Sequence, residues 1–157
     1  MLAVISPSKT LDYDSVCPSH CPTQPDFLNE ASELVAVLKE KTHPQLRQLM
    51  AISEKLADEN IERFKAWSQP FSEDNARAAI FAFKGDVYSG LETSAYGKPE
   101  LQYAQKHLRI LSGLYGVLRP LDLMQPYRLE MGTQLKNASG KDLYAFWAGR
   151  LTDNVNQ

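Results

Sequence analysis

Two kinds of hydrophobic spacing divide this sequence. Between residues 26 and 79 the apolar side chains recur at helical spacing, and they predict helices over 26–41, 44–52, 53–67 and 72–79. Elsewhere the apolar runs are short and are broken by glycine or polar residues, and they predict strands over 2–5, 80–83, 108–111 and 129–135. The run 80–83 fits a buried helix end equally well. Further helical patterns cover 99–107 and 142–157, with a single helical turn at 115–118.

Helices that precede and interrupt a few short strands indicate an α+β fold. A chain of 157 residues predicts one domain, with roughly 68–70% of its unfolded surface buried. Leu2–Ile5 is expected to be a buried strand, and Asp26 and Asp142 are expected to cap helices. The apolar runs are too short for a membrane span, and two cysteines are too few for a disulfide scaffold. We therefore expect a cytoplasmic protein without a membrane partner.

Charge is distributed unevenly along the chain. The net charge of −2 combines 10 basic and 15 acidic residues in 1–100 with 7 basic and 4 acidic residues in 101–157. A basic bias in the last third suggests an anion-binding face, although ordinary solubility explains it as well.

The segment Ser6-Pro7-Ser8-Lys9-Thr10 follows the first predicted strand. Its S-x-x-K spacing occurs in serine–lysine acyl-transfer enzymes, but the partner motifs of those enzymes are absent. Lys9-Thr10 also resembles the end of a P-loop, without the glycines that a P-loop needs. A lysine and hydroxyls at the end of a strand suit a phosphate, and a loop held by its own turn bonds is the alternative.

Two further segments contain glycines for which we expect a backbone role. Gly85 is expected to permit a tight bend after residues 80–84. Gly113 and Gly116 frame an apolar tip that we expect to be exposed, where backbone N–H groups could meet phosphate as in a helix-hairpin-helix. Two residues separate these glycines where that motif has one, and the spacing also matches the G-x-x-G loop of KH modules.

Cys17-Pro18-Ser19-His20-Cys21 invites a zinc interpretation. His43 and His107 lie in unrelated predicted helices, and two prolines favour a structural turn. We therefore expect neither a metal site nor a cofactor.

Four stretches make the sequence recognisable: Ile5–Asp12, Phe83–Leu91, Leu111–Gly132 and Lys141–Trp147. Together they resemble the YaaA family of bacterial peroxide-stress proteins over essentially the whole chain. The resemblance implies a cytoplasmic protein that limits intracellular free iron under peroxide stress and so protects DNA and proteins. It also implies DNA binding, a helix-hairpin-helix-like element in a fold peculiar to the family, and a longer protein of which these residues are the N-terminal part.

We expect DNA, in structured or single-stranded regions, to be held through its phosphates. The candidate residues are Ser6, Lys9, Thr10, Lys84, Arg109, Gly113, Tyr115, Gly116, Arg119 and Arg128. Tyr115 is assigned to stack on an unpaired base. One alternative is an enzyme acting on DNA or a nucleotide, with Lys9 and Asp86 or Asp122 as acid–base candidates, and another is an iron-handling protein. The sequence favours binding over catalysis.

Overall fold

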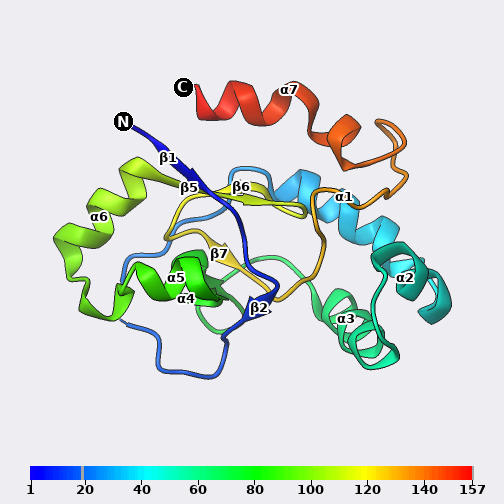
Figure 1. Ribbon diagram of the computed structural model, residues 1–157, viewed down its shortest axis with the longest axis horizontal. Coiled ribbons are helices and arrows are strands. Elements are labelled where there is room, and N and C mark those ends of the chain that lie inside the picture. Colours follow the sequence, from blue (N-terminus) through cyan, green and yellow to red (C-terminus); the bar gives the residue numbers. More distant parts are fainter. Residues whose placement is uncertain (19, 157) are drawn as a thin grey trace. The chain divides into compact units, whose positions relative to one another are not determined.

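The computed structural model describes residues 1–18 and 20–156, and its mixture of helices and short strands confirms the α+β class (Figure 1). The described chain forms two compact units. Unit 1 comprises residues 1–26, 68–111 and 117–126, and unit 2 comprises 27–67, 112–116 and 127–157. The one-domain expectation stays a prediction, and each unit is described by itself.

Unit 1 contains the short strands. Its elements are β1 (Ala3–Ile5), β2 (Thr10–Leu11), β3 (Arg77–Ala78), α4 (Ala79–Ala82), β4 (Phe83–Lys84), α5 (Asp86–Gly90), the 3-10 helix η1 (Thr93–Ala95), α6 (Lys98–His107), β5 (Leu108–Ser112), β6 (Gly116–Leu118) and β7 (Leu123–Met124). Strand order is β1-β5-β6 in one sheet, with β1 parallel to β5 and Ile5 opposite Ile110. Antiparallel pairs join β2 to β4 and β3 to β7. The end residues Ser112 and Gly116 of β5 and β6 belong to unit 2.

The core of unit 1 lies between its short elements and α6. Ala78, Ile80, Phe81, Leu101 and Leu121 form one buried cluster. Within the run 80–83, residues 80–82 lie in the short helix α4 and Phe83 begins β4. The helix and the strand interpretations are therefore each correct for part of the run. The predicted helix over 72–79 is wrong, because a turn and β3 occupy residues 73–78 and Ala79 only begins α4.

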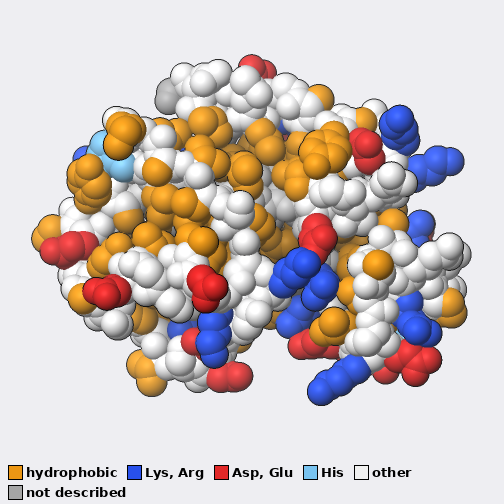
Figure 2. All heavy atoms as spheres, viewed as in Figure 1, with side chains coloured by type: hydrophobic (Ala, Val, Ile, Leu, Met, Phe, Trp, Pro, Cys, Tyr) orange, Lys and Arg blue, Asp and Glu red, His pale blue; other side chains and the backbone are white. Residues whose placement is uncertain are grey.

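The first strand is more exposed than its apolar sequence predicts. Val4 is 46% exposed and Ala3 is also exposed, so the described residues do not fully cover the faces of β1. Figure 2 shows hydrophobic side chains at the surface over this part of unit 1. Parallel strands are normally covered on both faces. The expectation of a buried strand is therefore wrong for these two residues.

Unit 2 contains α1 (Leu28–Lys39), α2 (His43–Met50), α3 (Glu54–Ala66) and α7 (Leu143–Val155). The side chain of Asp142 accepts a bond from Ala145 N at 2.8 Å and caps α7, as predicted. The N-cap of α1 is Phe27, so the capping assignment to Asp26 is wrong. Residues 129–135 form turns and loop, because their apolar side chains fill the core without joining a strand ladder.

The segment Ser112–Gly116 is a buried turn between strands, and residues 116–118 form β6 in place of the predicted helical turn. Leu114 and Tyr115 are 0% exposed, so the expectation of an exposed tip is wrong. The expected helix-hairpin-helix-like element is likewise a strand–turn–strand. The Nε1 of Trp147 donates to Gly113 O at 2.9 Å, and the Nε1 of Trp67 donates to Tyr115 Oη at 3.0 Å.

Each glycine of this turn has a separate steric reason. A Cβ on Gly113 would lie 2.1 Å from the carbonyl oxygen of Leu129. Gly116 has φ +76°, and its Cβ would lie 2.7 Å from Cζ3 of Trp147. Gly116 therefore combines a positive φ with close packing, whereas Gly113 is required by close packing alone. In both cases the neighbouring atoms belong to the protein.

Gly113→Ala and Gly116→Ala should each lower the free energy of unfolding by about 1–3 kcal/mol, through overpacking at both and backbone strain at Gly116. Gly90→Ala is the matched control, because a Cβ at Gly90 meets nothing within 4 Å. Urea unfolding of the three variants checks this. Parent-like stability of Gly113→Ala would contradict the close packing.

Candidate functional site

The pairing of β2 with β4 brings two distant candidate segments together. Thr10 lies opposite Lys84, and Leu11 lies opposite Phe83. The Ser8 hydroxyl donates to the carbonyl oxygen of Lys84 and accepts from Thr10 N at 3.2 Å. Residues 6–9 form a loop, so the helical arrangement that a serine–lysine acyl-transfer pair requires is not formed here.

Gly85 allows the close approach of these two segments. Its φ of +149° lies in the region that favours glycine, as the sequence predicted, and its Cβ would lie 3.0 Å from Ser8 Oγ. The hydroxyl of Tyr88 donates to Ser6 O at 2.7 Å from α5. Tyr88 stacks on Phe83 with 5.3 Å between ring centroids. The loop is therefore held from both sides.

The result is a polar surface that we call the Lys9–Lys84 face, made of Ser6, Lys9, Thr10 and Lys84. All four residues are exposed. Two ammonium groups beside two hydroxyls supply charge and hydrogen-bond donors to an oxyanion. The structure thus sets Thr10 opposite Lys84, with the exposed Ser6 and Lys9 in the loop that leads into β2.

A cavity of about 230 Å³, the Lys84 pocket, opens beside this face. Its wall includes Lys84, Gly85 and Tyr88, together with the hydroxyl-bearing Ser89 and Thr93. Ile80, Phe81 and Phe83 provide an apolar part of the wall. A ligand that combines a charged group with an apolar body fits such a lining.

A buried arginine, Arg77, forms part of the wall of the Lys84 pocket. Arg77, 9% exposed, donates from Nε to Phe81 O at 3.0 Å, from Nη1 to Ser15 O at 2.7 Å and from Nη2 to Ser15 Oγ at 3.0 Å. Ser15 Oγ in turn donates to Asp12 Oδ2 at 2.5 Å. The bond from the Ser15 side chain is the main reason that the pKa of Asp12 falls to about 2, and the Arg77 charge adds to it.

Sequence reasoning missed Asp12, Ser15 and Arg77. The detectable signal was Arg77 itself, a lone cation in the apolar run 76–83, where a buried charge must find partners. Asp12 with Ser15 three residues later also carries the spacing of a side chain that bonds its own turn.

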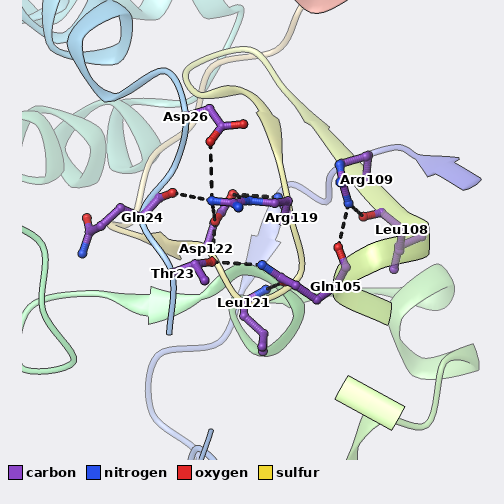
Figure 3. A network of polar contacts seen from close by, with 9 residues as sticks. All are labelled: Thr23, Gln24, Asp26, Gln105, Leu108, Arg109, Arg119, Leu121 and Asp122. Carbon is purple, nitrogen blue, oxygen red and sulfur yellow. Dashed lines mark hydrogen bonds and ion pairs between the residues drawn. The ribbon is translucent and has the colours of Figure 1, made fainter. Parts of the chain in front are cut away.

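Arg119 is engaged inside unit 1 (Figure 3). Its Nη2 lies 2.9 Å from Asp122 Oδ1 and 3.5 Å from Asp26 Oδ1, and it donates to Gln24 O at 2.8 Å. Asp122 is 1% exposed and also accepts from Thr23 Oγ1 at 2.6 Å. Burial raises the pKa of Asp122, and the bonds from Thr23 and Arg119 oppose that shift. The arginine fork braces a buried carboxylate in this structure.

Arg109 is bonded locally. Its Nη1 donates to the carbonyl oxygens of Gln105 and Leu108, each at 2.8 Å (Figure 3). Gln105 also receives a bond from Leu121 N at 2.7 Å. Arg109 therefore fastens the end of α6 to the start of β5.

The remaining candidates lie in unit 2. Gly113, Tyr115 and Gly116 are buried in the turn described above, and Arg128 is half-buried. Tyr115, at 0% exposure, has no surface to offer to a base in this structure. Of the acid–base candidates, Asp86 is exposed in α5 and Asp122 is the buried partner of Arg119.

Within residues 1–18 and 20–156, no three His, Cys, Asp or Glu side chains lie close enough to share a metal ion. Among the described helices, none is both long and apolar enough to cross a bilayer.

The Asp12 carboxylate should stabilise unit 1 only while it is ionised. Its pKa is lower in the folded chain than in the unfolded chain, so its contribution is complete above about pH 4 and disappears as pH falls toward about 2. Asp12→Asn should therefore lower the unfolding free energy at pH 6 more than at pH 3. Urea unfolding across this range checks it, with Asp14→Asn as the control. An equal loss at both pH values would contradict the assignment.

Arg119→Ala should lower the free energy of unfolding by about 2–3 kcal/mol, because it leaves the buried Asp122 without its cation. Arg47→Ala, which breaks an exposed pair with Glu54, should cost about 1 kcal/mol or less. Thermal and urea unfolding compare the two variants. If Arg119→Ala is no less stable than Arg47→Ala, the bracing role is wrong.

Comparison with known proteins identifies the same family that the four sequence stretches resemble. The family model described as "Peroxide stress protein YaaA" matches residues 1–157. UPF0246 proteins from Hahella chejuensis (strain KCTC 2396) and Janthinobacterium sp. (strain Marseille) are 57% and 54% identical over all of this chain, which covers 61% of each relative. A relative from Azoarcus sp. (strain BH72), UPF0246 protein azo1887, is 56% identical, with 60% of its length covered.

The chain thus spans about three-fifths of the length of these curated relatives. The match extends over every element described above, including the Lys9–Lys84 face and the buried turn at Ser112–Gly116. This chain belongs to the YaaA family of peroxide stress proteins.

Proposed function

We propose that this protein binds DNA through its phosphates as part of the peroxide-stress response, and that the Lys9–Lys84 face is the main contact surface of these residues. The observation that carries the proposal is the β2–β4 pairing. It sets Thr10 opposite Lys84, 74 residues away in the sequence, and the exposed Lys9 and Ser6 lie just before Thr10 in the chain. Phosphate contacts of this kind position a protein on DNA without reading sequence.

The engaged arginines change the expected distribution of contacts. Arg119 and Arg109 bond partners within unit 1. We therefore assign the larger share of phosphate neutralisation to Lys9 and Lys84, because both residues are exposed. The Asp12 carboxylate near this surface is already bonded to Ser15 and is faced by Arg77. Its negative charge therefore opposes an incoming phosphate less than an isolated carboxylate would.

Protection of DNA and proteins, and a lower level of free iron, are the proposed outcome of this response in the cytoplasm. The family membership supports a role in peroxide stress. We place the contribution of these residues in DNA binding, because Lys84 pairs with the loop segment that carries Lys9 and two hydroxyls, which suit a phosphate. Binding rather than catalysis is the function proposed.

A salt titration tests the lysine contacts. Affinity for duplex DNA should fall with salt by about 0.9 log units per tenfold change for each phosphate neutralised. Replacing both lysines, Lys9→Gln with Lys84→Gln, should make that slope shallower by about 1.8 and weaken binding similarly for unrelated sequences. Fluorescence anisotropy with a labelled 20-base-pair duplex measures both quantities.

The matched control is Lys39→Gln with Lys55→Gln, which removes the same charge from exposed positions on α1 and α3. This variant should keep the parent slope to within about one phosphate. Equal loss in both double variants would indicate a response to net charge alone, and would contradict the assignment of the contacts to the Lys9–Lys84 face. Salt-independent binding by the parent would contradict the phosphate mechanism itself.

A further inference from the structure

The strand β1 has an open edge in unit 1. β5 pairs with it on one side, and among the residues that the structure describes no strand pairs with it on the other (Figure 1). An open edge presents backbone N–H and C=O groups to a further strand. The start of β1 is held in place, because Nδ1 of His107 lies 2.9 Å from Met1 O. β1 is therefore a preformed template for strand addition.

Burial decreases across the sheet toward this edge. Ile110 on β5 is 0% exposed, whereas Ile5, which lies opposite it on β1, is only half-buried. Ala3 and Val4 are both exposed. Since consecutive residues of a strand point to opposite faces, neither face of β1 is fully covered. Exposed apolar side chains therefore border the open edge on both faces.

The sequence Leu2-Ala3-Val4-Ile5 is typical of an interior strand. Parallel strands that are covered on both faces have near-continuous aliphatic runs of this kind. Edge strands are commonly protected by a charged side chain or a proline, and residues 2–5 contain neither. Sequence and exposure together indicate that a further element covers β1.

The size of the edge restricts the kind of partner. β1 has only three residues, whereas specific interfaces between separate proteins bury roughly 1,200–2,000 Å². A strand of the same polypeptide pairs at a high effective concentration and does not need such an area. The longer family members have residues for this role, because this chain covers 61% of the relative from Hahella chejuensis.

We propose that the outer edge of β1 pairs with a strand from the two-fifths of the family protein that this chain does not match. The added strand extends the β1-β5-β6 sheet past β1, and the segments that flank it cover Ala3 and Val4. This interaction is separate from the phosphate contacts proposed above, because it uses the backbone and the apolar side chains of β1.

Hydrogen–deuterium exchange measured by NMR tests the proposal on two proteins, this 157-residue chain and the full-length Hahella chejuensis relative, which is 57% identical over it. After correction for intrinsic rates, the β1 amides that do not donate to β5 should exchange at least tenfold more slowly in the relative. The amide of the buried Ile110, and its match in the relative, serve as the reference within each protein. Equal exchange of β1 in the two proteins, fast or slow, would overturn the proposal.

Dilution distinguishes the proposed strand from a second copy of the protein. Protection by a strand of the same polypeptide does not depend on protein concentration. If the slow exchange of β1 in the relative is lost on dilution, the edge belongs to a second copy, and the proposal is overturned.

Two exposed valines of unit 1 provide matched variants. Val4→Lys and Val87→Lys should be tolerated equally in this chain, because the two side chains are 46% and 52% exposed. In the full-length relative, lysine at the position that matches Val4 should lower the urea midpoint of unfolding or prevent folding, whereas lysine at the position that matches Val87 should not. Equal midpoints for the two variants of the relative would contradict the covering of β1. No DNA is used, so this result is independent of the test of the phosphate contacts.

Discussion

The antiparallel pairing of Thr10–Leu11 with Phe83–Lys84 is the interaction on which the candidate site depends. It is only two residues long on each strand, so it needs support from around it. The Ser8 hydroxyl bonds Lys84 O, Tyr88 bonds Ser6 O, and Asp12 N donates to Ala82 O at 2.7 Å. Without this pairing Lys9 and Lys84 would lie on unrelated segments. With it Lys84 lies opposite Thr10, the residue that follows Lys9.

The chemistry of the first loop was predictable from the sequence, but its partner was not. Ser6, Lys9 and Thr10 follow an apolar strand, and that order alone suggested an anion site. Their meeting with Lys84 depends on a long-range strand pair of four residues, which carries no periodicity to detect. The tight bend at Gly85 was predictable because few residues other than glycine adopt a positive φ. Helix caps with local side-chain bonds, such as that of Asp142, were predictable for the same local reason.

The Ser112–Gly116 turn shows where pattern reasoning fails. Glycines beside an apolar tip fit both an exposed phosphate loop and a turn packed in a core. The deciding atoms belong to Leu129 and Trp147, which lie 13 or more residues along the chain from the turn's end and cannot be placed from spacing. Arginines are ambiguous in the same way. In the sequence Arg119 resembles a phosphate ligand. Its ion pair with Asp122, three residues away, assigns it a structural role only once the burial of Asp122 is known.

The most direct test of the account is to map the DNA-contact surface residue by residue. Backbone amide shifts of the ¹⁵N-labelled chain are followed by NMR while a short single-stranded oligonucleotide is added. We expect the largest shifts at residues 6–10 and 84–85, with the amides of Gly113–Gly116 nearly unchanged. The largest shifts at Gly113–Gly116, with residues 6–10 unaffected, would contradict it.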